Sequence, residues 1–332
     1  MIIPFFIPHA GCPHQCVFCN QKTITGQSRS VDALSIPHTV NTFLTGCASQ
    51  EPVQIAFYGG SFTALPIYSQ RDYLEACQPF ISAGKITSIR LSTRPDNISR
   101  EILAFLKSYN VETIELGVQS MNDQVLVLSG RGHTVADTLN AVALIHESGF
   151  TLGLQLMPGL PGDSAVHFME TITAVIELKP TFVRIYPAVV ITGTPLEELY
   201  RSGRYAPLTL ADAVSICGNA LVKFKRAGIG VIRMGLQPTK ELEKPGMIVA
   251  GPYHPAFRQL VESSIYLEIM RAALRQNNIG TGPSYFHLHP ADVSAAIGQK
   301  RSNIKQLIKE FGLASVHVIP DTHVPRGEIR YQ

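Results

Sequence analysis

Three cysteines near the N-terminus are the residues whose types and spacing point most directly to chemistry. Cys12, Cys16 and Cys19 stand four and three residues apart in one short segment, whereas the other three cysteines are scattered singly. Iron–sulfur clusters are held by Cys thiolates at short local spacings, usually four of them. Three thiols around a four-iron cluster leave one iron open, and an open position is what distinguishes catalytic metal sites from structural ones.

A zinc site is the alternative interpretation of these cysteines. Zinc normally takes four protein ligands in a structural site, with one cysteine pair balanced by a second pair elsewhere. His9 and His14 could complete such a set. The number of local thiols favours the iron–sulfur cluster over zinc.

Composition limits the class of protein. The chain has 332 residues, of which 45% are hydrophobic and 16% charged, as in globular proteins with more than one domain. The net charge of +3 is too small to indicate nucleic-acid binding by the whole chain, although residues 297–332 carry six Lys or Arg against three acidic residues. Clustered cysteines, no signal peptide and no transmembrane run predict a cytoplasmic protein without a membrane partner.

Apolar runs alternate with helical patterns along the first two hundred residues. The expected strands are 2–8, 53–58, 88–93, 113–118, 151–157 and 181–186, and the expected helices are 36–50, 98–108, 135–148 and 164–178. This alternation predicts parallel βαβ units, arranged as an open sheet or a partly closed barrel. In parallel barrels the functional residues lie on loops after the strands.

Several polar or glycine positions follow these strands and are candidates for a binding site. Gly59 and Gly60 would let the backbone approach a ligand closely, although Gly-Gly after a strand is also an ordinary turn. Arg94 offers a planar fork suited to a carboxylate, with a salt bridge to Asp96 as the alternative. Gln119 can hydrogen-bond a ribose hydroxyl or make an internal polar contact.

The pattern C-x3-C-x2-C, with Phe18 before its last cysteine, resembles the cluster motif of radical S-adenosylmethionine (SAM) enzymes. The resemblance implies a partial parallel (β/α)6 TIM-type barrel and a 4Fe-4S cluster whose open iron binds the amino and carboxylate groups of SAM. In that family, reduction cleaves SAM to a 5′-deoxyadenosyl radical that abstracts a hydrogen from the substrate. An electron donor such as flavodoxin or ferredoxin is then implied as a partner.

Further segments resemble the Elongator catalytic subunits and the oxygen-independent coproporphyrinogen oxidases. These segments read T-R-P-D at 93–96, L-G-V-Q-S at 116–120, M-P-G-L-P-G at 157–162 and I-Y-P at 185–187. The resemblance implies SAM-binding roles for Phe18, Gly59, Gly60, Ser61, Arg94, Gln119, Arg131 and Met157, with Ser61 standing where Glu is common. Elongator subunits carry an acetyltransferase domain after this core, and we expect no room for one in 332 residues.

The segment Ile297-Gly298-Gln299-Lys300-Arg301 resembles the GXXG loop of a KH domain, with Arg301 in place of the second glycine. The resemblance implies RNA binding through Gly298, Lys300, Arg301 and Lys305, with strands 316–320 and 329–331 beside the following helix. A basic surface helix in a small α/β appendage is the alternative. We expect a core over 1–200, an extension packing on it over 201–285, which includes a helix over 209–227 and a strand over 229–233, and the KH-like segment over 286–332.

Three functions remain open at this point. The first is a radical SAM enzyme acting on RNA, such as a tRNA base, and the second is a radical SAM enzyme acting on a small molecule or peptide. The third is a non-enzymatic, metal-stabilised RNA-binding protein. No residue of the sequence can be assigned to the substrate step.

Overall fold

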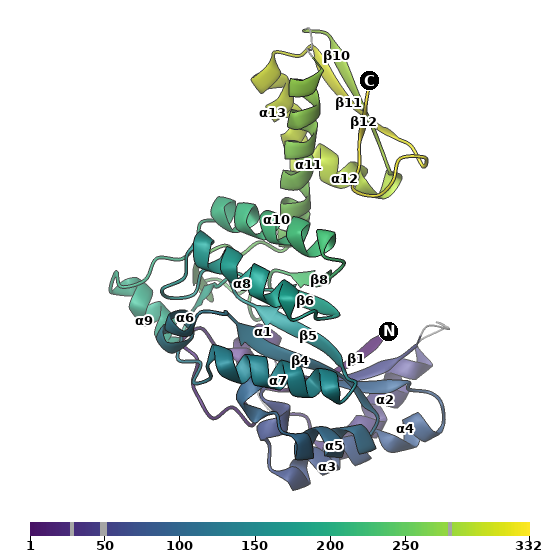
Figure 1. The fold of residues 1–332 in the computed structure, drawn as a ribbon, viewed down its shortest axis with the longest axis vertical. Coiled ribbons are helices and arrows are strands. Elements are labelled where there is room, and N and C mark those ends of the chain that lie inside the picture. Colours follow the sequence, from purple (N-terminus) through teal and green to yellow (C-terminus); the bar gives the residue numbers. More distant parts are fainter. Residues whose placement is uncertain (27–29, 47–51, 278–280) are drawn as a thin grey trace. The chain divides into compact units, whose positions relative to one another are not determined.

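The computed structural model describes residues 1–26, 30–46, 52–277 and 281–332. The chain divides into two compact units (Figure 1). The first unit comprises residues 1–209 and 223–253, and the second comprises residues 210–222 and 254–332.

A seven-stranded sheet forms the centre of the first unit. The strands are β1 (Ile2–Ile7), β2 (Gln54–Gly59), β3 (Ser88–Thr93), β4 (Val111–Gln119), β5 (Thr151–Leu156), β6 (Phe182–Ile185) and β8 (Gly230–Met234). They lie in the order β1-β2-β3-β4-β5-β6-β8, and every neighbouring pair is parallel. The six strands expected in the first two hundred residues are all present, and the expected α/β fold with a partial TIM-type barrel is confirmed.

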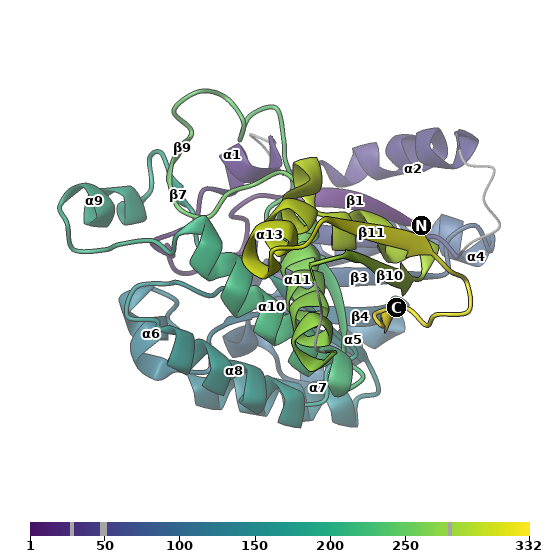
Figure 2. The ribbon, with the colours of Figure 1, turned by 90° about the horizontal axis from the view of Figure 1, so that it is seen from above.

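The two faces of this sheet differ in character, because successive side chains of a strand point to opposite faces. One face carries fully buried apolar side chains such as Ile55, Leu91 and Leu116. Along it run the helices α5 (Arg100–Ser108), α7 (Val135–Glu147) and α8 (Ala165–Glu177), as Figures 1 and 2 show. The other face, here called the inner face, carries polar side chains, among them Glu115 and Arg184.

The helices between the strands begin where local capping residues allow. Ser99 caps α5 by accepting from the backbone N–H of Ile102, and Thr134 with Asp137 forms a capping box at the start of α7. Helix α2 (Ile36–Thr45) ends earlier than the expected residue 50, and positions 47–50 lie outside the described residues.

Shorter elements complete the first unit. They are α1 (Gln21–Thr25), α3 (Ile67–Glu75), α4 (Gln78–Ser82), α6 (Asp123–Leu128), α9 (Pro195–Arg201) and the antiparallel pair β7 (Val190–Ile191) and β9 (Ile248–Ala250). Over the described ranges, no helix is long and apolar enough to cross a membrane.

The second unit is a small α/β structure. It contains part of α10 (Leu210–Arg226), then α11 (Phe257–Gln276), β10 (Pro283–Leu288), α12 (Val293–Ile297), α13 (Ser302–Phe311), β11 (Ser315–Pro320) and β12 (Arg330–Tyr331). Its sheet has the order β11-β10-β12, with β10 parallel to β11 and antiparallel to β12. Phe286, Leu288, Ile304 and Leu307 form its buried core. The expected helix 209–227 and strands 316–320 and 329–331 are present.

Candidate active site

The cysteine loop connects β1 to α1 and is held at both ends and in its middle. The backbone N–H of Cys12 donates to the carbonyl of His9 at 3.2 Å, and that of Cys19 donates to the carbonyl of Cys16 at 3.1 Å. Val17 donates to the carbonyl of Ser129 at 3.1 Å and accepts from the N–H of Leu196 at 2.8 Å. The loop is therefore fixed against two segments that follow much later in the chain.

The three thiols influence one another. Burial first, and then Cys16, raise the pKa of Cys12; burial, Cys16 and Cys12 raise the pKa of Cys19 to about 12. Three thiolates so near each other are unfavourable until a positive charge such as a metal compensates them. Within the described ranges, no three His, Cys, Asp or Glu side chains are arranged to hold a metal ion.

The donor set fits an iron–sulfur cluster better than zinc. A zinc site would need His9 or His14 as its fourth ligand. His9 Nε2 already accepts from the backbone N–H of Gln21 at 3.1 Å, and His14 lies exposed at the loop surface. Three local thiols match the three-cysteine arrangement that leaves one iron open.

The glycine pair after β2 packs directly on the cysteine loop. The N–H of Gly60 donates to the carbonyl of Ile7 at 3.0 Å, and that of Ser61 donates to the carbonyl of Ala10 at 2.8 Å. A Cβ at Gly60 would collide with the carbonyl oxygen of Ala10 and lie 2.7 Å from that of Ile7. The close approach that the sequence suggested for a ligand is thus made at Gly60 by the cysteine loop itself, while Gly59 adopts a φ of 101°.

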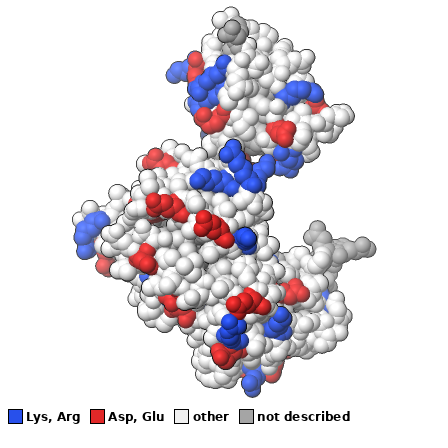
Figure 3. Space-filling model, in the orientation of Figure 1, with Lys and Arg blue, Asp and Glu red and all other residues white. Residues whose placement is uncertain are grey.

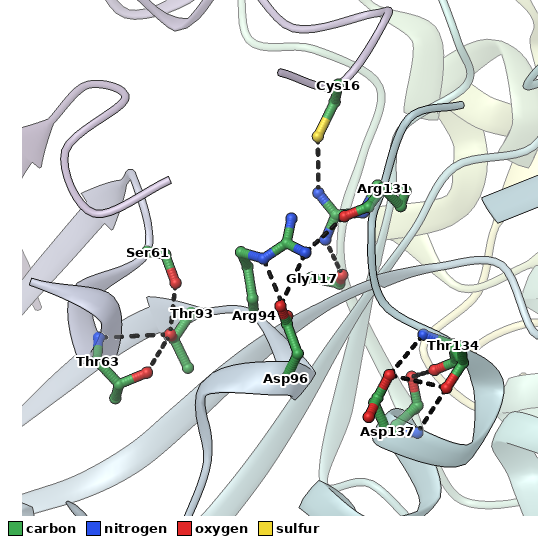
Figure 4. Close-up of polar contacts among 11 residues, drawn as sticks. Cys16, Ser61, Thr63, Thr93, Arg94, Asp96, Gly117, Arg131, Thr134 and Asp137 are labelled. Atoms are coloured by element: carbon green, nitrogen blue, oxygen red, sulfur yellow. Dashed lines mark hydrogen bonds and ion pairs between the residues drawn. The ribbon is translucent and has the colours of Figure 1, made fainter. Parts of the chain in front are cut away.

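Thr93 joins the loop after β2 to the end of β3. Its Oγ1 lies 3.0 Å from Ser61 Oγ and 2.6 Å from Thr63 Oγ1, and all three hydroxyls are buried (Figure 4). Ser61, in the position where the resemblance expects Glu, is therefore occupied in an internal hydroxyl network.

Two arginines connect the strand ends to the cysteine loop. Arg131 Nη1 donates to Cys16 Sγ at 3.1 Å, and Arg131 Nη2 donates to the Gly117 carbonyl (Figure 4). Arg94 forms an ion pair with Asp96 at 2.9 Å and donates to the Arg131 carbonyl. Arg94 thus makes the salt bridge that sequence analysis gave as its alternative role, and it supports the loop that carries Arg131.

Gln119 ends β4 in a conformation that a non-glycine residue rarely adopts, with φ at 68°. Backbone strain of this kind costs about 1–3 kcal/mol and is concentrated at functional sites. The side chain is 3% exposed and accepts from Gln155 Nε2 at 3.2 Å, and its carbonyl accepts from the N–H of Met157 at 2.9 Å. Gln155 was not singled out from the sequence, where its signal is a polar residue between Leu154 and Leu156.

Phe18 and Met157 meet in one apolar cluster. Met157 is buried with Val125, Leu160 and Ala188, and Phe18 packs against this group from the cysteine loop. The structure therefore brings the cysteine loop, the glycine loop, Gln119, Arg131 and the Met157 loop together at the carboxyl ends of the strands.

The candidate nucleic-acid residues lie in the second unit, between α12 and α13. Gly298, Lys300 and Arg301 all have positive φ, at 74°, 50° and 61°. Lys305 follows on α13 and is exposed. The turn therefore presents two basic side chains from a backbone conformation that glycine would adopt more easily.

Comparison with known proteins decides the family. Residues 6–175 match the Radical SAM superfamily, and residues 180–266 match the Radical SAM C-terminal domain. The chain belongs to the radical SAM superfamily. It is therefore an enzyme of this class, and the family implies a 4Fe-4S cluster and SAM.

Relatives place the chain near the Elongator catalytic subunits within this superfamily. It is 31% identical over 221 residues to the uncharacterized protein MJ0486 of Methanocaldococcus jannaschii, covering 62% of this chain and 66% of that protein. It is 29% identical to a tRNA uridine(34) acetyltransferase of the same organism, covering 51% of this chain and 35% of that protein. A solved structure of Elp3 from Methanocaldococcus infernus shares the fold, with a TM-score of 0.61, 24% identity, and coverage of 82% and 63% of the two chains. The chain thus spans between about a third and two thirds of these relatives.

His133, which sequence analysis did not single out, is expected to make the protein sensitive to acid. Burial first, and then Arg131 and Arg94, lower its pKa from 6.5 to about 3. Between these values the unfolded chain binds a proton that the folded chain does not, so the free energy of unfolding decreases as the pH falls below about 6.5. We expect His133→Gln to reduce this decrease by about 1–2 kcal/mol between pH 6.5 and pH 5, measured by urea unfolding.

The exposed His38 provides the control for this measurement. His38→Gln makes the same substitution at a surface position. Parallel curves for His133→Gln and the parent would contradict the assignment of this acid sensitivity to His133.

Proposed function

We propose that the protein cleaves SAM reductively and uses the resulting radical to modify a base of a tRNA-type RNA. The observation that carries the radical part is the three-cysteine loop, which is fixed against the glycine loop and touched at Cys16 by Arg131. Cys12, Cys16 and Cys19 would hold the 4Fe-4S cluster, which would supply the electron for the reductive cleavage of SAM. A flavodoxin or ferredoxin is the proposed electron donor.

The residues of this chain supply binding and orientation. Arg131 fixes the loop at Cys16 and offers a cationic surface beside the thiols. Gln119 is held in a strained conformation at the end of β4, and we assign it to a hydroxyl of the SAM ribose. Gly59 and the Met157 loop form the remaining walls proposed for SAM.

The proposal of an RNA substrate is supported by the relatives and by the second unit. One relative is named a tRNA uridine(34) acetyltransferase, and the similarity covers 51% of this chain and 35% of that protein. In the second unit, the KH-like turn from Gly298 to Arg301 precedes an amphipathic helix packed on a three-stranded sheet. A turn of this kind suits contact with a nucleic-acid backbone.

The proposed RNA contact is assigned to the basic turn and not to a broad basic surface of the second unit. On the face of the second unit that Figure 3 shows, basic side chains are interrupted by acidic ones. Arg271 and Arg275, for example, are both paired with Glu310. Among the described residues of this unit, Lys300 and Arg301 are the adjacent basic residues that both have positive φ.

Removing charge from the turn should weaken RNA binding. We expect Lys300→Gln and Arg301→Gln each to lower affinity for tRNA and to reduce the slope of log affinity against log salt by about 0.7 to 0.9. The measurement is filter binding or fluorescence anisotropy at several salt concentrations. Arg275→Gln, on an exposed residue of α11, is the control with the same charge change.

The outcome decides between the open functions. Equal effects of Arg275→Gln and the two turn variants would remove the assignment of the turn. Absence of RNA binding together with SAM cleavage would leave a radical SAM enzyme with a small-molecule or peptide substrate.

A further inference from the structure

A second polar group lies on the inner face of the first unit, apart from the cysteine loop. It comprises Tyr58, Arg90, Glu115, Arg184 and Tyr186, and we refer to it as the inner-face network. Arg184 Nε lies 2.6 Å from Glu115 Oε2, and Arg184 Nη2 donates to the Tyr58 hydroxyl at 2.9 Å. Tyr58 donates to Glu115 Oε1 at 3.2 Å, and Arg90 Nη1 lies 3.4 Å from the same oxygen.

The charges of this network do not balance. Two guanidinium groups share one carboxylate, and no other carboxylate of the described residues contacts Arg90 or Arg184. Tyr58 does not offset the difference, because burial and Glu115 raise its pKa and keep the hydroxyl neutral. The register of β6 and β8 places Arg233 beside Arg184, which adds further positive charge to the inner face.

Arg90 is the least satisfied member. It is 9% exposed, and its Nε has no hydrogen-bond partner among the described residues. Within the network it lies 3.4 Å from Glu115 and hydrogen-bonds Tyr58. Outside the network, the centroid of the Phe182 ring lies 5.4 Å from the guanidinium carbon. A buried guanidinium without full pairing is costly, and an anion bound nearby would offset that cost.

The network also lies beside the residues assigned to SAM. Gln155 stands next to Gly117 on one side and Arg184 on the other in the strand register, and it donates to Gln119. Tyr58, Arg184 and Tyr186 each keep part of their surface exposed. The network is therefore partly accessible to an anion.

We propose that the inner-face network binds a phosphate or carboxylate group of the substrate, with Arg184 and Arg90 as its charged anchors. The planar fork of arginine matches both groups in a bidentate geometry. Anchoring the anion here positions the rest of the substrate next to the strand ends, where a radical would react. This inference rests on the proposed function, because it takes the inner face as the place where substrate meets SAM.

The test compares two variants of the inner-face network, one that removes a positive charge and one that removes the negative charge. The SAM-loaded, anaerobically prepared enzyme is titrated with inorganic phosphate and, separately, with acetate at constant ionic strength, and dissociation constants are obtained by NMR. We expect Arg184→Gln to weaken binding at least about tenfold, since it removes a charge-assisted hydrogen bond. We expect Glu115→Gln to tighten binding, since it removes the one negative charge. Arg100→Gln, on an exposed arginine paired with Glu147, should change neither constant.

The result also identifies the anion, because only the dissociation constant of the anion that fits the network should change in both variants. Weaker binding in Glu115→Gln as well as in Arg184→Gln would indicate damage to the fold and would overturn the proposal. An equal loss of affinity for SAM in Arg184→Gln would also overturn it, because the network would then serve SAM. SAM cleavage without binding of either anion would overturn this inference alone, whereas absence of SAM cleavage would overturn the proposed function.

Discussion

Cys16→Ala is expected to remove the iron and sulfide of the anaerobically purified protein and to abolish SAM cleavage. Cys16 is the central thiol of the loop and the one that Arg131 contacts. Mutation of residues that only hydrogen-bond metal ligands already changes metal affinity by about 10–100-fold. Loss of a ligand itself should therefore reduce SAM cleavage by more than about a hundredfold. The measurements are iron and sulfide content and the yield of 5′-deoxyadenosine.

Cys77→Ala is the matched control for this prediction. Cys77 is a fully buried thiol of the same unit that donates to the carbonyl of Tyr73, and it lies outside the loop. The control variant should keep its iron. Full iron content in Cys16→Ala, or equal loss in Cys77→Ala, would show that the loop is not the cluster site.

Gly60→Ala is expected to have the second large effect, through packing alone. The added methyl would collide with the carbonyl oxygen of Ala10 in the cysteine loop and lie 2.7 Å from the carbonyl oxygen of Ile7 at the end of β1. Overpacking of this kind costs about 1–3 kcal/mol and should displace the loop that carries the thiols. We therefore expect lower thermal stability together with reduced iron content.

Gly46→Ala gives the comparison for the added methyl group. At Gly46 the nearest atom to a new Cβ is 3.8 Å away, and its φ is negative. This variant should retain both stability and iron. A Gly60→Ala protein with unchanged iron content would contradict the close packing of the two loops.

The sheet could be predicted from sequence because its strands are short apolar runs separated by helical patterns. In β5, for example, the buried Leu152, Leu154 and Leu156 lie on the helix-covered face. The position of the site followed from the same pattern, since parallel strands place their following loops at one edge.

The contacts within the site could not be predicted, because they join distant residues. Arg131 and Cys16 are 115 residues apart, and no local pattern indicates that they touch. Glu115 and Arg184 lie on inner-face positions of two strands, where a charged residue in an apolar run gives no information about its partner. The roles of His133 and Gln155 depend on burial, which only the packed structure reveals.

Helix α11 and strand β10 were missed for a different reason. The buried positions of α11 include Ser263 and Tyr266 as well as apolar residues, which weakens its helical pattern. Gly-Pro and His-Pro pairs lie just before the helix, and residues 251–256 form the turn into it. In strand β10, buried Phe286 and Leu288 alternate with more exposed positions. This alternation is short and begins at Pro283, so the sequence there is also typical of a turn.

The most direct test of the central claim is the cleavage of SAM by the anaerobically purified protein after reduction with dithionite. The account predicts about four irons and four sulfides per chain and formation of 5′-deoxyadenosine, which requires both the reductant and the three loop cysteines. Zinc without iron, with SAM left intact, would contradict the assignment of Cys12, Cys16 and Cys19 to a radical SAM cluster.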